Sequence, residues 1–199
     1  MADKAKIAVL VSGGGTNLQA LIDAQKSGII SSGEIKLVIS NNEGAYALQR
    51  AKKANITAIV CNKKLLGEEF EDTLIELLDE NEIDIIVLAG FMCILSERFT
   101  SHFANRIINV HPSLIPSFCG KGFYGLRVHE AALEYGVKVT GATVHFVNEI
   151  PDGGKIIMQK AVCIKDDDTP ETLQRRVMEE AEWKILPMSV EKVSKQIKG

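Results

Sequence analysis

Short, continuous runs of apolar residues recur along the first 110 residues, with room for a helix between successive runs. Such runs are typical of buried parallel strands, whereas amphipathic helices place apolar residues every three or four positions. This alternation predicts an α/β fold: a doubly wound, Rossmann-like, mostly parallel sheet with helices on both faces. The apolar runs are residues 7–11, 35–39, 58–60, 85–89 and 107–110, and the helical spacing covers residues 17–26, 45–54 and 68–81.

The pattern changes after residue 136, where longer strand-like runs replace the earlier alternation. Residues 138–148 and 155–164 are joined by segment 149–154, which contains the turn signal Pro-Asp-Gly-Gly, so we expect antiparallel strands near the C-terminus. Thr169 as N-cap and Pro170 at the first helical position predict a final long helix. No linker or repeat interrupts the chain, which predicts one domain.

Charge and hydropathy narrow the classes of partner. The chain has 23 basic and 26 acidic residues among 199, a formal net charge of −3. A weakly acidic protein lacks the positive field on which non-specific binding to nucleic acid or anionic membranes depends. The longest apolar run, residues 85–95, falls short of the roughly 20 residues that a transmembrane helix needs. We therefore expect small-molecule substrates, with no nucleic-acid and no membrane partner.

The N-terminal segment indicates the cellular location, and the spacing of the cysteines indicates whether they bind a metal. From Met1 the chain runs directly into a strand-like segment without the pattern of a secretory signal, which predicts a cytoplasmic location. The cysteines form no Cys-x-x-Cys pair, so we expect free thiols and no metal. The adjacent acids 166–168 are expected to form a solvated turn before the final helix. The four cysteines are Cys61, Cys93, Cys119 and Cys163.

A glycine-rich loop follows the first predicted strand. The segment Ser12-Gly13-Gly14-Gly15-Thr16-Asn17 leads into a helix, so backbone N–H groups converge as in an anion site. It lacks the Gly-Lys-Ser/Thr of a Walker loop, and Leu18 stands where a dinucleotide fingerprint has glycine. A phosphomonoester such as a sugar phosphate or mononucleotide fits better. The alternative is a plain strand-to-helix turn capped by Thr16.

Asn109 and His111 stand at the carboxyl end of the fifth predicted strand, where open α/β sheets bind ligands. Residues two apart in a strand face the same side, so an amide donor and an imidazole are expected side by side. They suit oxyanion stabilisation with proton transfer, although both also occur as ordinary strand terminators. Asp152 is expected to serve the hairpin turn; near His111 it would favour the imidazolium. The remaining histidines, expected to be structural, are His102, His129 and His145.

Four segments occur in order along the chain: Ser12-Gly13-Gly14-Gly15-Thr16-Asn17-Leu18-Gln19-Ala20-Leu21, Leu88-Ala89-Gly90-Phe91-Met92, Asn109-Val110-His111-Pro112-Ser113-Leu114 and Val144-His145-Phe146-Val147. In this combination, and over essentially the whole chain, the sequence resembles the phosphoribosylglycinamide formyltransferases. The resemblance implies transfer of a formyl group from the co-substrate 10-formyltetrahydrofolate to the amine of glycinamide ribonucleotide, in purine biosynthesis. It also implies one formyltransferase domain, 1–199, with a phosphate-binding half over about 1–110 and a folate and catalytic half over about 111–199.

The resemblance also assigns roles to residues that match the family's motifs. A catalytic trio acts on the formyl group, a loop holds the substrate phosphate, and an acid holds the ribose hydroxyls. The folate is expected to lie against an apolar wall. The matching residues are Asn109, His111 and Asp152 for catalysis; Gly15, Thr16, Asn17 and Glu182 for the ribonucleotide; and Leu88, Phe91, Met92, Cys93, Ile94, Leu95 and Asn109 for the folate.

The sequence departs from the family's pattern around the folate tail. The family commonly has arginine where Cys93 stands, and a further arginine near Gly67 that helps hold the tail carboxylate. Lys63 or Lys64 is the expected substitute, as a point charge without the bidentate fork of arginine. The loop 118–127 is also longer than in some members.

By this resemblance we expect direct attack of the neutral amine on the formyl carbon, with the oxyanion met by Asn109 and protonated His111. Neither a covalent intermediate nor a metal is expected. Hydrolysis of formyltetrahydrofolate is the second enzymatic hypothesis, although the hydrolases related to this family carry an additional regulatory domain. Methionyl-tRNA formyltransferase shares the catalytic core but adds a nucleic-acid-binding domain. A non-catalytic folate or nucleotide module is the remaining alternative, and the protein is expected to be a monomer or homodimer.

Overall fold

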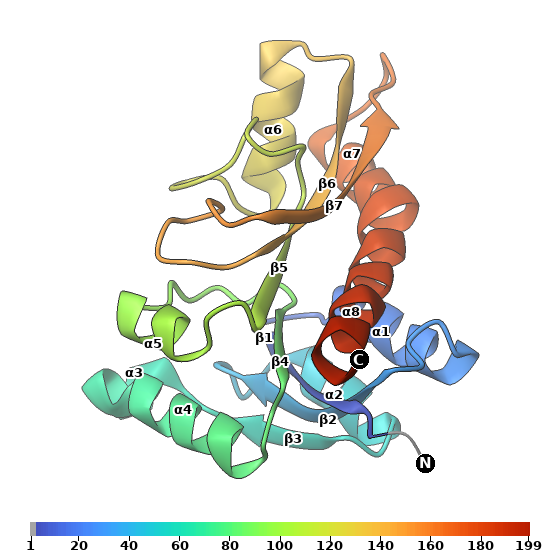
Figure 1. Cartoon of the computed structure of the whole chain (residues 1–199). Coiled ribbons are helices and arrows are strands. Elements are labelled where there is room, and N and C mark those ends of the chain that lie inside the picture. Colours follow the sequence, from blue (N-terminus) through green and yellow to red (C-terminus); the bar gives the residue numbers. More distant parts are fainter. Residues whose placement is uncertain (1–2) are drawn as a thin grey trace.

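The computed structural model describes residues 3–199. Met1 and Ala2, the first residues of the N-terminal segment that lacks the pattern of a secretory signal, lie outside the described residues. A seven-stranded sheet crosses the described part in the order β3-β2-β1-β4-β5-β6-β7 (Figure 1). The first five strands are parallel, and the last two run antiparallel to their neighbours. The strands are β1 Ala5–Val11, β2 Gly33–Ser40, β3 Thr57–Val60, β4 Ile85–Leu88, β5 Ile107–His111, β6 Val139–Phe146 and β7 Ile156–Cys163.

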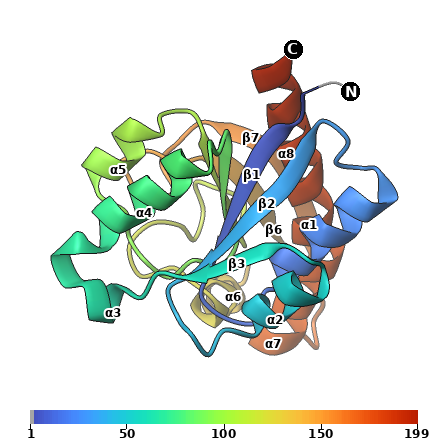
Figure 2. The ribbon, with the colours of Figure 1, turned by 90° about the horizontal axis from the view of Figure 1, so that it is seen from below.

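Helices cover both faces of this sheet (Figure 2). One apolar core lies under α1, α2, α7 and α8, and a second lies under α4 and α5. The doubly wound, mostly parallel architecture expected from the sequence is confirmed. The helices are α1 Thr16–Ser27, α2 Tyr46–Lys53, α3 Lys63–Leu66, α4 Phe70–Glu80, α5 Glu97–His102, α6 Leu126–Tyr135, α7 Pro170–Val177 and α8 Trp183–Lys198.

The two cores explain why the strands have continuous apolar sequences. Along β1, Ile7, Val9 and Val11 pack into the core under α1 and α8, whereas Ala8 and Leu10 pack into the core under α4. Burial on both faces requires an apolar side chain at every position of a parallel strand. Each predicted strand is confirmed, with ends that differ by one or two residues.

The final helical run contains a wide turn. Between α7 and α8 the chain forms a π-helical turn, Met178–Glu182, and Pro187 lies within α8. A proline has no N–H to donate to the carbonyl four residues earlier, so regular helical bonding cannot hold throughout this run. The turn ends at Glu182, which is buried beside α1. π-turns of this kind occur frequently at functional sites.

Several local features differ from the expectation. Helix α3 has no predicted counterpart, and for α5 and α6, which contain His102 and His129, the sequence indicates helical surroundings but no bounds. The acids 166–168 form a turn as expected, with Asp166 and Asp167 exposed, but the Asp168 side chain is 1% exposed and accepts two hydrogen bonds of 2.5 Å from the Arg176 guanidinium. The four cysteines are free, as predicted. Across residues 3–199, no helix has the length and apolar character that crossing a membrane would need.

Candidate active site

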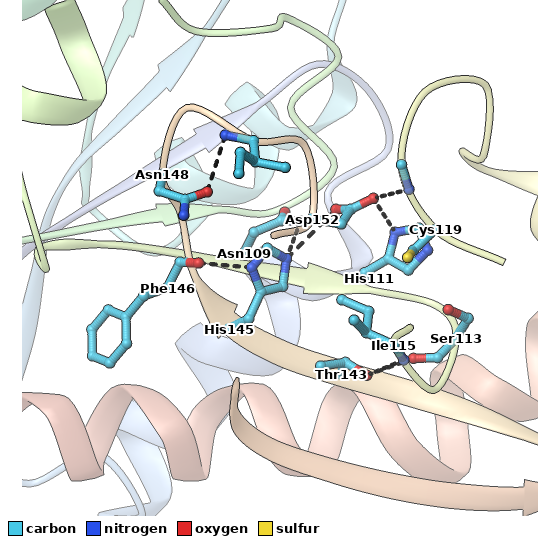
Figure 3. A network of polar contacts seen from close by, with 12 residues as sticks. Asn109, His111, Ser113, Ile115, Cys119, Thr143, His145, Phe146, Asn148 and Asp152 are labelled. Carbon is cyan, nitrogen blue, oxygen red and sulfur yellow. Dashed lines mark hydrogen bonds and ion pairs between the residues drawn. The ribbon is translucent and has the colours of Figure 1, made fainter. Parts of the chain in front are cut away.

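Asn109 and His111 lie near the carboxyl end of β5, on the same side of the sheet (Figure 3). β5 pairs with β4 on one side and with β6 on the other, so its backbone is held along both edges. His111 is buried, and Asn109 is partly exposed. The strand periodicity that places both side chains together is therefore confirmed, on a platform with little freedom to move.

Asp152 reaches the same place from the connection between β6 and β7. It follows Pro151 in a β-turn spanning residues 150–153 and adopts a left-handed φ of 56°. Proline at the second position and a left-handed residue at the third are the signature of a type II turn. A Cβ on Gly154 would lie 1.7 Å from the Phe146 carbonyl oxygen, so only glycine permits this close return. The hairpin turn thus aims its acid at the β5 pair.

His145 belongs to this cluster, contrary to the expectation of a purely structural role. In the antiparallel β5–β6 pairing it stands directly opposite Asn109. The Asn109 amide donates to His145 Nε2 at 3.2 Å, and His145 Nδ1–H donates to the Phe146 carbonyl at 2.8 Å. His145 Nε2 also lies 3.6 Å from an Asp152 carboxylate oxygen. His145 therefore sets the orientation of the Asn109 amide and stands next to the Asp152 carboxylate.

The environment of His111 sets its charge in the free protein. Its Nδ1 lies 3.6 Å from Asp152 Oδ2, and its Nε2–H donates to the Phe118 carbonyl at 2.9 Å. Burial is the largest influence and lowers the pKa of His111, and the opposing effects of Asp152 and the Phe118 carbonyl offset it only in part. Asp152 thus favours the imidazolium, as expected, but burial outweighs it. Neutral His111 is the main form at neutral pH.

Asp152 remains a carboxylate in this cluster. Burial raises its pKa, but the contacts with His145 and His111 outweigh burial, and the net pKa is lowered. The Gly120 N–H adds a hydrogen bond of 2.8 Å to Asp152 Oδ2. The loop that follows β5 therefore touches two members of the cluster, His111 through Phe118 and Asp152 through Gly120.

The two remaining histidines lie outside the cluster. His102 pairs with Asp79 at 2.9 Å on the surface. His129 is fully buried, and neither ring nitrogen has a hydrogen-bond partner among the described residues. Burial, with a smaller effect of the nearby His111 charge, lowers the pKa of His129 to about 4. Within residues 3–199, no three metal-ligating side chains come together as a metal site.

The glycine loop between β1 and α1 turns its carbonyl groups toward the β2–α2 segment. Three successive carbonyls accept hydrogen bonds there, whereas no described residue accepts one from the N–H groups of residues 13–17. These N–H groups remain free to bind an anion at the start of α1. The three bonds join the carbonyls of Ser12 to Asn42 (3.4 Å), Gly13 to Ala47 (3.0 Å) and Gly14 to Arg50 (2.8 Å).

Thr16 is not the N-cap of α1, so this part of the alternative prediction is wrong. Gly15 is the N-cap of α1, with φ 70° and no side-chain cap, and Thr16 is already helical. Residue 15 needs both this left-handed backbone and a close approach to α2, so a residue with a Cβ does not fit.

We expect Gly15→Ala to lower the free energy of unfolding by about 2 kcal/mol, because alanine strains the left-handed backbone. Its Cβ would also lie 2.6 Å from the Ala47 Cβ. Gly14→Ala is the matched control, since a Cβ there meets nothing within 4 Å. Urea unfolding of both variants checks this, and equal stabilities would contradict it.

Glu182 and Asn17 meet beside the glycine loop, although they come from opposite ends of the chain. The Asn17 amide donates to Glu182 Oε2 at 2.7 Å. Burial raises the pKa of Glu182, and the Asn17 hydrogen bond opposes this only in part. Asn17 Oδ1 is buried without a partner among the described residues. The acceptor capacity of this oxygen is therefore unused within the described residues.

An apolar cavity opens beside the β5 cluster. Asn109, His145 and Asp152 form its polar end, and the segment after β4 forms its apolar side. Met92 is 58% exposed and does not line it, unlike the other five expected wall residues. No Lys or Arg lines it among the described residues, and Lys63 lies 5.5 Å over the Phe70 ring instead. The lining residues are Leu88, Phe91, Cys93, Ile94, Leu95, Asn109, His145, Val147, Asn148, Glu149, Ile150, Pro151 and Asp152.

Known proteins resemble the chain over most of its length. A phosphoribosylglycinamide formyltransferase of Haemophilus influenzae is 44% identical over 93% of the chain and 85% of its own length. The trifunctional purine biosynthetic protein adenosine-3 of Homo sapiens is 47% identical over 96% of the chain, which spans only 18% of that protein.

Solved structures agree as well. The glycinamide ribonucleotide transformylase 1 of Symbiobacterium toebii superposes with a TM-score of 0.90 at 39% identity, covering 97% of this chain and 89% of that one. The family model described as formyl transferase matches residues 5–190. The chain therefore belongs to the formyl transferase family.

Proposed function

We propose that this protein transfers the formyl group of 10-formyltetrahydrofolate to the amine of glycinamide ribonucleotide, a step of purine biosynthesis. The observation that carries the proposal is that Asn109 and Asp152 line one end of an apolar cavity, with buried His111 3.6 Å from the Asp152 carboxylate. An amide donor, an imidazole and a carboxylate suit a reaction that develops charge on a carbonyl oxygen. The names of the similar proteins point to the same acceptor and to transfer of the same group.

The ribonucleotide would bind along the carboxyl ends of β1 and the strands beside it. Its phosphate would accept hydrogen bonds from the free N–H groups of Gly15, Thr16 and Asn17 at the start of α1. Glu182 and Asn17 offer acceptor oxygens for the ribose hydroxyls. This arrangement places the amine toward β5, because β4 and β5 follow β1 in the sheet.

The folate would occupy the apolar cavity, with its formyl group at the polar end beside Asn109. Leu88, Phe91 and Leu95 supply apolar contact for the pterin, and the backbone between them offers polar groups. Since no cation lines the cavity in the described part of the chain, the carboxylate tail would extend beyond it toward solvent.

In the reaction, the neutral amine nitrogen attacks the formyl carbon and forms a C–N bond. The tetrahedral oxyanion accepts hydrogen bonds from the Asn109 amide and from His111. The bond from the formyl carbon to the folate nitrogen then breaks, and the proton lost by the amine ends on that nitrogen. Atoms and charge balance without a covalent enzyme intermediate.

The oxyanion itself would change the charge of His111. In the free protein, burial keeps the pKa of His111 below its usual value. A negative charge forming within hydrogen-bond distance favours the imidazolium, and the Asp152 carboxylate adds to that effect. His111 would therefore take up the proton that the attacking amine loses and return it to the leaving folate nitrogen, with Asp152 fixing the direction of its Nδ1.

We expect Asp152→Asn to lower the pKa of His111 further, because the neutral amide no longer favours the imidazolium. Turnover should fall as well. NMR titration of the histidine ring protons measures the shift, with His111→Ala to assign the signal and His102 as an internal reference. A His111 pKa that rises or stays unchanged would contradict the role of Asp152.

Hydrolysis of formyltetrahydrofolate is the competing reaction, since the same cluster can direct a water at the formyl carbon. Dependence of tetrahydrofolate release on glycinamide ribonucleotide separates the two reactions. We expect release only when the ribonucleotide is present. A protein that binds both compounds and releases no tetrahydrofolate would instead be a binding module.

A further inference from the structure

The apolar side of the cavity depends on few hydrogen bonds for its shape. We call residues 88–95 the donor wall. From Phe91 to Ser96 the chain has no regular secondary structure, and Gly90 before it has φ 73°. Met92 and Ile94 are 58% and 76% exposed, so packing alone holds this part of the wall weakly.

Two hydrogen bonds tie the donor wall to the phosphate side of the site. The Met92 N–H donates to Ser12 Oγ at 2.8 Å, and Asn41 Nδ2 donates to Cys93 Sγ at 2.9 Å. Ser12 directly follows β1 and begins the glycine loop, and Asn41 directly follows β2. Because β2, β1 and β4 are neighbours in the sheet, these contacts lie where three parallel strands end.

The far end of the donor wall is anchored elsewhere. The Ser96 N–H donates to a Glu71 carboxylate oxygen at 2.8 Å, and the Ser96 hydroxyl donates to the other oxygen. Glu71 belongs to α4, which packs on the opposite face of the sheet from the helices around the glycine loop. The wall is thus held in its middle by Ser12 and Asn41 and just after its last residue by Glu71, and of these contacts only those in the middle are connected to the phosphate side.

A phosphate bound by the N–H groups of residues 13–17 would restrict the backbone next to Ser12. Because Ser12 Oγ accepts the hydrogen bond from the Met92 N–H, a more ordered Ser12 also makes the wall more ordered. Folate binding then loses less conformational entropy when the ribonucleotide is already bound. Coupling of this kind is reciprocal between two ligands.

We propose that Ser12 and Asn41 are positioning residues that couple the two substrate sites, so that each substrate raises the affinity for the other. This inference rests on the proposed function, because it takes the ribonucleotide and folate as the two ligands. Ser12 acts through its hydroxyl oxygen as an acceptor, and Asn41 acts through its amide as a donor. Neither group has to touch a reacting atom.

Calorimetric titration with tetrahydrofolate, which has no formyl group to transfer, tests the coupling. For the unaltered protein we expect saturating glycinamide ribonucleotide to lower the folate Kd by about 10-fold. Ser12→Ala and Asn41→Ala should each reduce this ratio to about 2-fold. Asn41 Oδ1 is already without a partner among the described residues, so the second substitution should leave the fold intact even if the first does not.

Ser96→Ala is the matched control, since it loosens the wall at the end not connected to the glycine loop. It should weaken folate binding equally with and without the ribonucleotide, and leave the ratio unchanged. A ratio of one in the unaltered protein, or an unchanged ratio in both Ser12→Ala and Asn41→Ala, overturns the coupling but not the proposed function. Failure of the unaltered protein to bind either compound contradicts the proposed function itself.

Discussion

Replacement of His111 by alanine is expected to lower kcat by about 100-fold to 1000-fold, the usual effect of losing one oxyanion donor. His111 is buried at the end of β5, with its Nδ1 facing Asp152. Asn109→Ala should have an effect of similar size, because its amide is the second donor. Steady-state kinetics at saturating concentrations of both substrates measure the change.

His102→Ala is the matched control for this experiment. His102 is a surface residue paired with Asp79, outside the cavity and the β5 cluster. We expect its variant to retain the kcat of the unaltered protein. Near-normal turnover by a folded His111→Ala or Asn109→Ala protein, judged by circular dichroism and thermal unfolding, would exclude these residues from catalysis.

Replacement of Glu191 by alanine is expected to lower the free energy of unfolding by about 3 kcal/mol. The Glu191 carboxylate on α8 accepts hydrogen bonds from the backbone N–H groups of Ser31 and Ser32, both at 2.9 Å. It also accepts from the Ser31 and Ser32 hydroxyls, and Lys195 lies 3.2 Å away. Alanine would leave the two N–H groups between α1 and β2 without this acceptor. Urea unfolding at neutral pH measures the loss.

The contribution of Glu191 should depend on pH. Burial raises the pKa of Glu191, but the hydrogen bonds from Ser32 and Ser31 outweigh it, and the net pKa falls from 4.5 to about 2. The stabilisation is therefore complete above about pH 4.5 and is lost as the pH falls toward 2. Glu179→Ala, which removes an exposed pair with Arg175, should cost less than about 0.5 kcal/mol. Equal losses in the two variants would contradict this account.

Much of the fold could be predicted because the central strands β1, β2, β4 and β5 are largely buried, whereas the edge strand β3 is mostly exposed. The buried strands are mainly apolar in sequence, and Thr169 and Pro170 mark the start of the last helical run clearly. The short helices α3 and α5 have no such pattern. α5 contributes Phe99 to a core that tertiary packing creates, and its six residues are too few to show a helical period. The buried pair of Asp168 and Arg176 likewise depends on packing.

The candidate site could be predicted only in part from the residues themselves. Asn109 and His111 follow from strand periodicity, which is a local property. His145 does not, because its position depends on the register between β5 and β6, and no sequence pattern defines which residue of β6 faces Asn109. Glu182 was identified by resemblance alone, since a contact with Asn17 across 165 positions has no local signal. The lowered pKa of His111 arises from burial, which only the folded chain creates.

Release of tetrahydrofolate from 10-formyltetrahydrofolate by the purified protein, measured with and without glycinamide ribonucleotide, tests the proposed reaction most directly. We expect release that depends on the ribonucleotide and is largely lost in the His111→Ala protein. Equal release without the ribonucleotide would contradict it, because the protein would then direct water rather than an amine at the formyl group.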